Sequence, residues 1–528
     1  MSNHAYESAA ALRPSSNGPI PISTLCERFS LAPASAEDAA ALNDLSILGV
    51  SVDSADTAPG ELFVGLPGFT VHGARFAADA VASGAVAVLT DADGAQIVHQ
   101  AAPGTPVLVH SDPRAVVGPL SAEVYHHPAR GLVTTAVTGT NGKTTTAYFL
   151  DAILSAHVGG CMVAGTVELR VGERSVESPR TTVEAPVLQR MMALAVEDKV
   201  GAASLEASSH AIVLHRLDGI VVDVAGFTNL QRDHLDFHKT MEGYLEAKAQ
   251  LFTPEHARRG VVCVDDQWGA ALAAEAPIEI DRVRAYPGET PADWWVSDAA
   301  VSLTDSATTF TLHGPDGEKI EASCPLPGLV NVQNAALALV MAIRAGVPAA
   351  TAAAALAGAH NIPGRMQRIS QRDGRRGLCI VDFAHTPEAM ELALKAVRPI
   401  TPGRLIVVFG SDGDRDQGKR PMLGEVCARL ADVLVVTDEN PRSEDPQLIR
   451  NAILEGVRGV RPDLTDVEEI TTWRGDAVRR GVELCGPDDT VIVTGKGHEP
   501  FLEMAGEFIR YNDAPVMAEA VEEKWGRA

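Results

Sequence analysis

One short stretch limits the fold of this chain more than any other. An apolar and β-branched run at 132–137 leads directly into the glycine-rich segment TGTNGKTTT (138–146), and a helical pattern follows. A strand that enters a helix through such a turn is typical of a parallel α/β sheet. Backbone N–H groups at the turn and at the helix start bind anions. The order Gly142, Lys143, Thr144 predicts a nucleotide phosphate, with the lysine on its terminal phosphates and the threonine hydroxyl on Mg²⁺.

The loop departs from the common phosphate-binding pattern at its start. Val137 stands where the first glycine usually lies, and the loop opens instead at Gly139. A tight turn that ends in lysine by chance is the simpler alternative, but the strand before it and the helix after it favour phosphate binding. The candidate phosphate contacts are Gly139, Thr140, Asn141, Gly142, Lys143, Thr144 and Thr145.

A chain of 528 residues is too long for one hydrophobic core, and we expect three α/β domains. Turn-rich joints at HHPARG (126–131) and NIPGRMQ (361–367) give domains at 1–131, 132–362 and 363–528. The central domain is predicted to hold a parallel sheet covered on both faces, because its strands are near-continuous apolar runs. Its strands are expected at Leu132–Val137, Gly201–Glu206, Val221–Thr228 and Gly260–Val264.

The third domain alternates strand and helix four times, which predicts a doubly wound, Rossmann-like sheet. Ligands of such sheets bind beyond the carboxyl ends of the strands. We expect strands at Leu378–Phe383, Arg404–Phe409, Val433–Thr437 and Thr490–Thr494, and helices near Pro387–Val397, Met422–Leu430, Pro446–Val457 and Gly475–Leu484.

Bulk properties exclude several classes of protein. A formal net charge of −25 argues against general binding to nucleic acid or to an anionic membrane, which both need a basic excess. Seven scattered cysteines without a CxxC pair indicate neither a zinc site nor a disulfide framework and favour a reducing cytoplasm. The N-terminal segment lacks the apolar core of a signal peptide, and the most apolar stretch, 335–359, is interrupted by Arg344, Gly346 and Pro348. We expect a cytoplasmic protein without membrane insertion.

Polar clusters follow two further central strands. Glu206 ends one of them, TNLQRDHLDFH (228–238) follows the next with His234, and Lys248 lies on a later helix. In a parallel sheet these ends converge near the phosphate loop. Each residue alone is weak, since an isolated glutamate is usually a solvated charge and an isolated lysine usually lies at the surface. Together, Glu206 and Thr144 could supply the oxygen ligands of a cation that neutralises triphosphate.

The third domain places three charged turns at strand ends: GSDGDRDQGKRP (410–421), DENPRSEDP (438–446) and GKGHE (495–499). Each alone could be a surface turn. At one sheet edge they predict a polar pocket, in which Arg415 and Arg442 pair with a carboxylate. Glu499 could hold an ammonium group. The pocket suits a zwitterionic amino acid.

Ten motifs in order, from about residue 53 to 499, resemble the Mur ligases. They are TGTNGKTTT, EASSH…R (206–216), TNLQRDHLDFH, YLEAKAQLF (244–252), LPGLVNVQN (326–334), PGRMQ (363–367), DFAHTPEAM (382–390), GDRDQGKRP, NPRSEDP and GKGHE. Within that family they are most similar to the members that add meso-diaminopimelate to UDP-MurNAc-L-Ala-D-Glu. The resemblance implies a three-domain, monomeric enzyme that consumes ATP and forms an amide through an acyl phosphate.

The resemblance also assigns residues to the substrates. Asn334, Arg365 and Asp382 would contact ATP, and Ser54 would hold the uridine nucleotide in the first domain. The muramoyl-dipeptide would bind Thr181, Thr182, Ser208 and Arg216, and diaminopimelate would bind Arg415, Glu439, Asn440, Pro441, Arg442, Gly495 and Glu499.

Lys248 matches a lysine that is carbamylated in this family, which turns a cation into a carboxylate. Such a group would hold a second Mg²⁺ together with His234 and Glu206, whereas a bare ammonium would repel the metals. The implied catalytic residues are Lys143, Lys248, Glu206 and His234, and the implied metal ligands are Thr144, Glu206, His234 and Lys248.

Three positions differ from the family pattern. Glu439 stands where aspartate is usual, Ala55 where arginine commonly follows Ser54, and Leu214 where some relatives have glutamine. None removes a group that the chemistry needs. Three alternatives remain: a lysine-adding ligase, a folylpolyglutamate synthase-like ligase, and a nucleotide-gated regulatory protein without turnover. Arg442 favours diaminopimelate over lysine, since lysine lacks the second carboxylate that a guanidinium binds.

Overall fold

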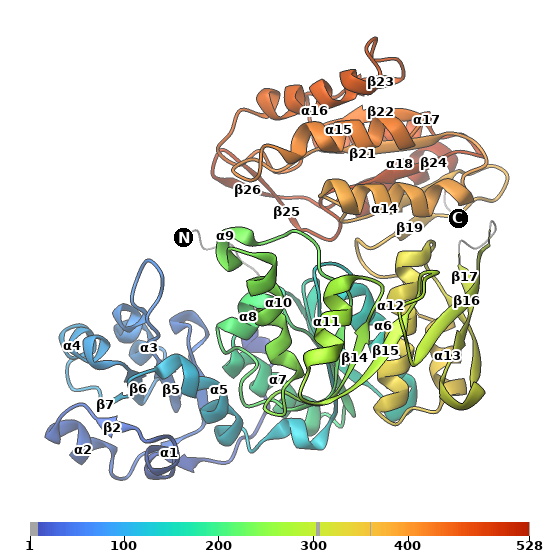
Figure 1. The fold of residues 1–528 in the computed structure, drawn as a ribbon. Helices are drawn as coiled ribbons and strands as arrows, with labels where there is room; N and C mark the ends of the chain where they lie inside the picture. Colours follow the sequence, from blue (N-terminus) through green and yellow to red (C-terminus); the bar gives the residue numbers. More distant parts are fainter. Residues whose placement is uncertain (1–8, 303–306, 360, 527–528) are drawn as a thin grey trace. The chain divides into compact units, whose positions relative to one another are not determined.

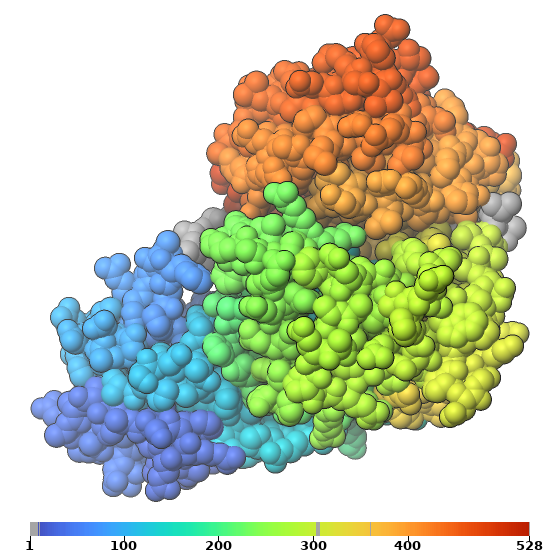
Figure 2. All heavy atoms as spheres, in the orientation of Figure 1, coloured from blue at the N-terminus to red at the C-terminus, as the bar shows by residue number. Residues whose placement is uncertain are grey.

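The computed structural model describes residues 9–302, 307–359 and 361–526. These residues form two compact units. The first unit runs to Trp295 and includes Ala336–Ala355, and the second comprises Val296–Ala335 and the chain from Leu356 onward. Figure 1 shows an α/β fold in both units, and Figure 2 shows side chains filling the spaces between the ribbons. The finer boundaries at 131/132 and 362/363 remain predictions.

The first unit begins with a five-stranded sheet in the order β2-β7-β6-β5-β4. Strands β4 to β7 are parallel, and β2 pairs antiparallel with β7. Apolar side chains such as Leu62, Val64 and Leu89 form its core. The strands are β2 (Ala32–Pro33), β4 (Gly49–Ser51), β5 (Glu61–Val64), β6 (Ala87–Thr90) and β7 (Val107–Val109), and the α-helices are α1 (Ile22–Phe29), α2 (Ala36–Leu42), α3 (Ala77–Ala82), α4 (Ala92–Ala101) and α5 (Pro113–Val124).

A second sheet in the same unit carries the phosphate loop. Its parallel strands run in the order β9-β12-β8-β13-β14-β15-β16, so β8 lies between β12 and β13. Strands β10 and β11 add antiparallel at the β9 edge. The strands are β8 (Val133–Thr138), β9 (Cys161–Ala164), β10 (Glu168–Val171), β11 (Arg174–Glu177), β12 (Ala202–Glu206), β13 (Val222–Phe227), β14 (Ala257–Cys263), β15 (Glu279–Arg284) and β16 (Trp294–Val301).

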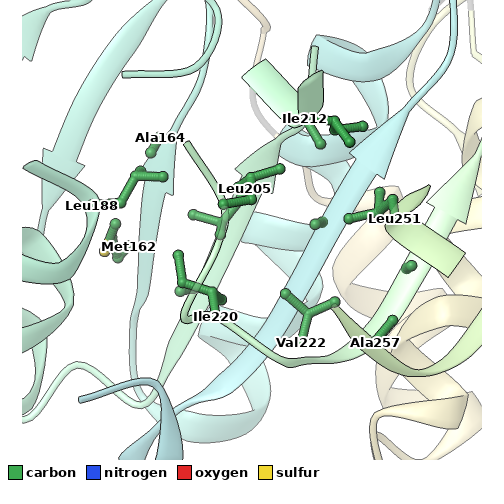
Figure 3. Packing of buried hydrophobic residues seen from close by; sticks show 14 of the residues in the cluster. Met162, Ala164, Leu188, Leu205, Ile212, Ile220, Val222, Leu251 and Ala257 are labelled. Carbon is green, nitrogen blue, oxygen red and sulfur yellow. The ribbon is translucent and has the colours of Figure 1, made fainter. Parts of the chain in front are cut away.

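Helices cover this sheet and bury its apolar runs. Helix α6 packs on β8, β9 and β12, α7 packs on β9, and α11 packs on β14 and β15. Figure 3 shows Met162, Leu205 and Val222, from three of the parallel strands, within this core. The helices are α6 (Lys143–Val158), α7 (Ala185–Glu197), α8 (Ser209–Val213), α9 (Leu235–His238), α10 (Met241–Ala249), α11 (Gln267–Glu275), α12 (Leu329–Arg344) and α13 (Ala349–Ala357).

The second unit contains a hairpin of β17 (Thr308–His313) and β18 (Lys319–Cys324) and a six-stranded sheet. That sheet has the order β19-β20-β24-β21-β22-β23, parallel except for β19. Its strands are β19 (Gln367–Ser370), β20 (Leu378–Val381), β21 (Leu405–Phe409), β22 (Val433–Val436), β23 (Val467–Glu469) and β24 (Thr490–Val493).

Helices lie on both faces of the six-stranded sheet, as a doubly wound fold requires (Figure 1). Helices α17 and α18 pack together on one face, while α15 packs between α14 and α16. A separate hairpin, β25 (Phe501–Met504) and β26 (Glu507–Arg510), precedes the last helix. The helices are α14 (Pro387–Val397), α15 (Lys419–Leu430), α16 (Pro446–Val460), α17 (Arg474–Leu484) and α18 (Asp513–Trp525).

The predicted α/β class and the parallel strands named from sequence are confirmed within about two or three residues. Helix α15 begins at Lys419 rather than Met422, because Pro421 falls in its first turn, where proline is tolerated. The hairpin strands β10, β11, β25 and β26 were not predicted. Among the described residues, no helix is both long and apolar enough to cross a membrane.

A fully buried ion pair joins α17 to α18 in the second unit. The side chains of Arg474 and Asp513 are 0% exposed, and two hydrogen bonds of 2.9 and 2.8 Å connect them. The same guanidinium donates to the carbonyls of Asp438 (3.0 Å) and Thr494 (2.8 Å), which follow β22 and β24. Arg474 therefore fixes the starts of the two loops that contain the NPR and GKGHE segments.

We expect the substitution Arg474→Ala to lower the local unfolding free energy around β24 and α17 by about 3–5 kcal/mol, since it leaves Asp513 buried without a counter-charge. Hydrogen exchange of these elements measures the change. Arg479→Ala is the matched control on the same helix, because Arg479 pairs with Glu519 and Glu523 at the surface. Its cost should stay below about 1 kcal/mol. Equal effects of the two substitutions would contradict the assignment.

Candidate active site

The phosphate loop joins β8 to α6 in the conformation that its glycines allow. Gly139 has φ +144° and Gly142 has φ +89°, both in the region that side chains disfavour. A Cβ at Gly139 would lie 1.9 Å from the Thr228 hydroxyl oxygen, so the close approach also excludes a side chain there. The backbone N–H groups at the start of α6 form the predicted anion site.

Hydrogen bonds tie this loop to the segment after β13. The N–H of Thr140 donates to the Asn229 carbonyl (2.9 Å), and the N–H of Asn141 donates to Asn229 Oδ1 (3.1 Å). In return, the Thr228 hydroxyl donates to the Asn141 carbonyl (2.6 Å). The sequence singled out Asn229 only as part of a polar cluster, whereas the structure shows that it shapes the phosphate loop.

The predicted lysine and threonine lie at the two ends of the anion site. The ammonium of Lys143 turns back over the loop and donates to the carbonyls of Gly139 and Thr140, both at 3.0 Å. The Thr144 hydroxyl donates to Glu206 Oε2 (3.0 Å), and both side chains are buried. The structure therefore brings Thr144 and Glu206 together, as the parallel sheet predicts.

Glu206 is anchored by a residue that the sequence reading missed. Thr166 donates to Glu206 through its N–H (2.8 Å) and its hydroxyl (2.9 Å). Thr166 follows β9, so it lies at the same carboxyl edge of the sheet as Glu206. The signal was available in AGT (164–166), a glycine and a threonine directly after an apolar run.

Four residues assigned to the dipeptide surround the carbonyl side of Glu206. The Thr182 hydroxyl donates to the Glu206 carbonyl (2.7 Å) and accepts from the Ser208 N–H (3.0 Å). Arg216 donates to the Thr182 carbonyl (3.1 Å), and its Nε is buried without a partner. Thr181 accepts a hydrogen bond from Thr166 (3.2 Å). The four residues therefore lie together beside the metal and phosphate groups.

Lys248 is buried rather than exposed, so the ordinary expectation of a surface lysine is wrong here. Its side chain is 1% exposed, and its ammonium donates to the Gly139 carbonyl (2.9 Å) and approaches the Thr138 hydroxyl (3.5 Å). Among the described residues, no carboxylate pairs with it. Burial, helped by the charge of Lys143, lowers the pKa of Lys248 well below its usual value.

Three histidines and two aromatic rings lie beside Lys248. His210 contacts His234 and Phe237, with centroid distances of 4.8 and 4.3 Å. Tyr244 is stacked on His238 and lies 4.5 Å below the Lys248 ammonium. Burial lowers the pKa of His234, and the charges of Lys143 and Lys248 lower it further. The neutral imidazole is the form that binds a metal.

The donor set fits Mg²⁺ in part. Thr144 and Glu206 offer hard oxygen atoms at one place, the type of ligand that Mg²⁺ prefers. Lys248 as an ammonium does not fit, because it would repel a cation. No group of three or more His, Cys, Asp or Glu side chains in the described ranges could hold a metal ion by itself.

The remaining ATP candidates lie in the second unit. Asp382 accepts from the N–H groups of Met366 (2.8 Å) and Ala384 (2.9 Å), and Arg365 lies over the Phe383 ring at 4.3 Å. Asn334 is 2% exposed, and its Oδ1 has no partner. Arg365 and Asp382 are thus brought together, since they flank the backbone of Met366.

The GKGHE and NPR segments meet at the carboxyl edge of the six-stranded sheet. Asn440 Nδ2 donates to Glu499 Oε2 (3.1 Å) and to Asp412 Oδ1 (3.0 Å). Lys496, fully buried, donates to Asn440 Oδ1 (2.9 Å) and to Glu499 Oε2 (3.1 Å). The predicted pocket residues Asn440 and Glu499 are therefore in direct contact. Lys496 and Asp412 belong to the same network although neither was singled out from the sequence.

Arg442 has an unusual backbone conformation that the β25–β26 hairpin holds in place. Its φ is +55°, which non-glycine residues rarely adopt. Its N–H donates to the Glu503 carbonyl (3.0 Å), and its carbonyl accepts from the Ala505 N–H (2.7 Å). The guanidinium lies 3.8 Å from Asp412 and 3.7 Å from Glu503, and its Nε is buried without a partner. That Nε remains available to an incoming carboxylate.

The other predicted pocket residues divide into two groups. Glu439 is 3% exposed and packs so close to Gly495 that a Cβ there would lie 2.4 Å from its carboxylate. Burial, with the charge of Asp412, raises the pKa of Glu439 to about 8. Pro441 is buried and its carbonyl packs on Gly413. Arg415, in contrast, is exposed and makes no contact with these residues in the part of the chain described.

Ser54 lies apart from the dipeptide residues, in a short 3-10 helix (Ser54–Asp56) of the first sheet's domain. Asp56 of the same helix pairs with the buried Arg190 of α7 (2.9 Å). Helix α7 begins three residues after Thr182. The Ser54 segment is therefore linked to the dipeptide residues through one helix.

Three family models match the chain in order. They are described as "Mur ligase family, catalytic domain" (residues 46–125), "Mur ligase middle domain" (137–342) and "Mur ligase, glutamate ligase domain" (364–497). Each matched range contains one group of candidate residues: Ser54, the phosphate loop with Glu206 and Lys248, and the pocket of Arg442.

Curated relatives match over nearly the whole chain. A UDP-N-acetylmuramoyl-L-alanyl-D-glutamate–2,6-diaminopimelate ligase of Streptomyces avermitilis is 43% identical over 92% of this chain and 94% of its own length. A UDP-N-acetylmuramyl-tripeptide synthetase of Leifsonia xyli is 42% identical over 95% of this chain and 96% of its own length.

Solved structures share the fold. A structure of a UDP-N-acetylmuramoyl-L-alanyl-D-glutamate–2,6-diaminopimelate ligase covers 90% of this chain and 95% of its own, with 31% identity and a TM-score of 0.63. A folylpolyglutamate synthase of Mycobacterium tuberculosis, with ADP, covers 71% of this chain and 90% of its own at 18% identity and a TM-score of 0.56. That second likeness shows a common fold only.

Gly139→Ala tests the phosphate loop. We expect it to weaken ATP binding at least about tenfold, because a side chain at this φ is strained and meets Thr228. Titration with ATP measures the affinity. Gly159→Ala is the control at the other end of α6, where φ is also positive (+83°) but no atom lies within 4 Å of the new Cβ. It should leave ATP affinity unchanged. Unchanged affinity in Gly139→Ala would contradict the phosphate-loop assignment.

Proposed function

The chain belongs to the Mur ligase family, and we propose that it is the ATP-dependent ligase that joins meso-diaminopimelate to UDP-MurNAc-L-Ala-D-Glu. The product is a precursor of peptidoglycan. The observation that carries the proposal is the pocket of Arg442, Asn440 and Glu499 in a chain 43% identical to a relative named for this reaction. We also infer a cytoplasmic monomer.

Activation of the carboxylate is the first step. An oxygen of the D-glutamyl carboxylate attacks the γ-phosphorus of ATP, the bond to the β-phosphate oxygen breaks, and ADP leaves. Lys143 and the N–H groups at the start of α6 stabilise the charge on the phosphates. Thr182, Ser208 and Arg216 orient the dipeptide beside this loop. Thr144 and Glu206 would hold Mg²⁺, which neutralises triphosphate charge when bound.

Amide formation is the second step. The amine of diaminopimelate attacks the acyl carbon, phosphate leaves, and the amine loses a proton. No protein nucleophile is needed, so the chain acts by positioning and electrostatics. Arg442 binds the carboxylate at the far end of diaminopimelate, and Glu499 binds an ammonium group. These contacts choose the amino acid before the amide forms.

The test is ADP release by the purified chain with ATP, Mg²⁺, bicarbonate and UDP-MurNAc-L-Ala-D-Glu. We expect turnover with diaminopimelate and about 100-fold lower kcat/KM with lysine. Arg442→Ala should lower kcat/KM for diaminopimelate about 100-fold and change the value for lysine little, because only the former has a carboxylate at its far end. Mass spectrometry identifies the peptide product.

Arg458→Ala is the matched control, since Arg458 is an exposed arginine on α16 of the same unit. Its kinetics should equal those of the unsubstituted chain. Equal use of lysine and diaminopimelate would replace the proposal with a lysine-adding ligase. ATP consumption that depends on neither co-substrate would reject the ligase function.

We further propose that Lys248 acts as a carbamate. Its burial and the absence of a paired carboxylate among the described residues support a neutral amine, the form that attacks CO₂. The nitrogen bonds to the carbon of CO₂ and releases a proton, leaving a carboxylate near Thr138 and Gly139. That carboxylate, with His234 and Glu206, would complete a second metal site.

Removal of CO₂ should therefore reduce ADP release, and bicarbonate should restore it. Lys248→Ala should reduce turnover by at least about 100-fold, and ¹³C NMR with labelled bicarbonate should show a carbamate signal that this variant lacks. Lys239→Ala is the control, since this nearby lysine donates only to the Asp236 carbonyl (2.5 Å). A carbamate signal that persists in Lys248→Ala would reject the assignment.

A further inference from the structure

Lys496 is a buried cation to which the proposed reaction gives no task. It follows β24 in the segment 495–499, and its side chain is 0% exposed. The glycines on either side, Gly495 (φ +106°) and Gly497 (φ +53°), both have positive φ. A buried ammonium is costly unless its donors are satisfied, so its position calls for compensating acceptors.

Three acceptors from three segments surround this ammonium. It donates to Asn440 Oδ1 (2.9 Å) of the NPR turn, to Glu499 Oε2 (3.1 Å) and to the Phe501 carbonyl (2.6 Å) of β25. An ammonium has three donors, so its hydrogen-bonding capacity is filled. Lys496 therefore joins the NPR turn, the GKGHE segment and the β25–β26 hairpin at one point.

This contact fixes the orientation of the Asn440 amide. Because lysine can only donate, the Asn440 oxygen must face Lys496. The same oxygen accepts from the Glu503 N–H (3.2 Å), while the amide nitrogen donates to Asp412 and Glu499. Every group of Asn440 then has a partner of the correct type. A reversed amide would place its NH₂ group against the ammonium.

The carboxylate of Glu499 is held by one oxygen and presents the other. Its Oε2 accepts from both Lys496 and Asn440. Its Oε1 accepts no hydrogen bond from the described residues, and the side chain is 37% exposed. The anchored oxygen therefore determines where the second oxygen points, and that second oxygen is available to a ligand's ammonium group.

Lys496 also balances the charge of the pocket. The side chains of Asp412, Glu439 and Glu499 act on one another there, and the charges of Asp412 and Glu499 disfavour ionisation of Glu439. Arg442 lies at the partly exposed side of this group, 3.8 Å from Asp412. Lys496 is the cation that contacts Asn440 and Glu499 directly, so its loss would leave Glu499 without its buried counter-charge.

We propose that Lys496 is a positioning residue of the amino-acid pocket: its ammonium holds the Asn440 amide and the Glu499 carboxylate so that Glu499 Oε1 receives the ammonium group of the incoming amino acid. This inference rests on the proposed function. It adds a residue that acts through Glu499 and does not itself touch the substrate.

The test is Lys496→Met in the full-length chain, which keeps the shape of the side chain and removes its charge. We expect KM for diaminopimelate to rise at least about tenfold, because Glu499 loses its anchor. The KM values for ATP and UDP-MurNAc-L-Ala-D-Glu should change by less than about twofold, since neither binds Glu499. On a Glu499→Gln background, Lys496→Met should raise KM for diaminopimelate by less than about twofold further.

Lys524→Met is the matched control. Lys524 also donates to three acceptors in the second unit, the carbonyls of Val482, Glu483 and Cys485, at the end of α17. Its loss should leave all three KM values unchanged. If Lys496→Met does not fold, Lys496→Gln replaces it, because an amide keeps a donor without the charge. Failure of both variants to fold would overturn the inference, since Lys496 would then be structural.

Two further outcomes overturn the inference. One is an unchanged KM for diaminopimelate in Lys496→Met, and the other is an equal rise in the KM of all three substrates. Both require that the unsubstituted chain turns over diaminopimelate. If the unsubstituted chain releases no ADP with diaminopimelate, the proposed function itself fails, which is a separate result.

Discussion

The hydrogen bonds between the phosphate loop and the segment after β13 are the constraint on which the first unit depends. Thr140 and Asn141 donate to Asn229, and Thr228 donates back to Asn141. These bonds require a glycine at 139, because the loop passes against the Thr228 side chain. They also hold the loop carbonyls that accept from Lys143 and Lys248. Phosphate binding and the burial of Lys248 are thus consequences of one loop contact.

Buried cations have the same role in the second unit. Arg474 holds the backbone where the NPR and GKGHE loops begin, and Lys496 holds the side chains at their far ends. Burying such charges is expensive, and their retention is best explained by the orientation they impose. The exposed Arg442 can then vary its partner while the groups around it stay fixed.

Sequence patterns predicted the parts of the molecule in which local chemistry determines structure. The strand before Gly139, the helix from Lys143 and the approach of Glu206 to Thr144 all follow from apolar periodicity and parallel strand order. Thr166 and Lys496 were missed, because their roles depend on partners 40 and 56 residues away. The burial of Lys248 was likewise hidden, since its helix shows only a weak division into apolar and polar faces.

The left-handed backbone of Arg442 has a consequence for how the chain is made. Its N–H and carbonyl are satisfied only by residues 503 and 505, about sixty positions later in the sequence. Contacts of such separation form late, because a long loop must close first. On the ribosome, the strands β20 to β22 emerge well before the hairpin that supports Arg442. A nascent chain therefore acquires its nucleotide loop early and its selectivity for the amino acid only near the end of synthesis.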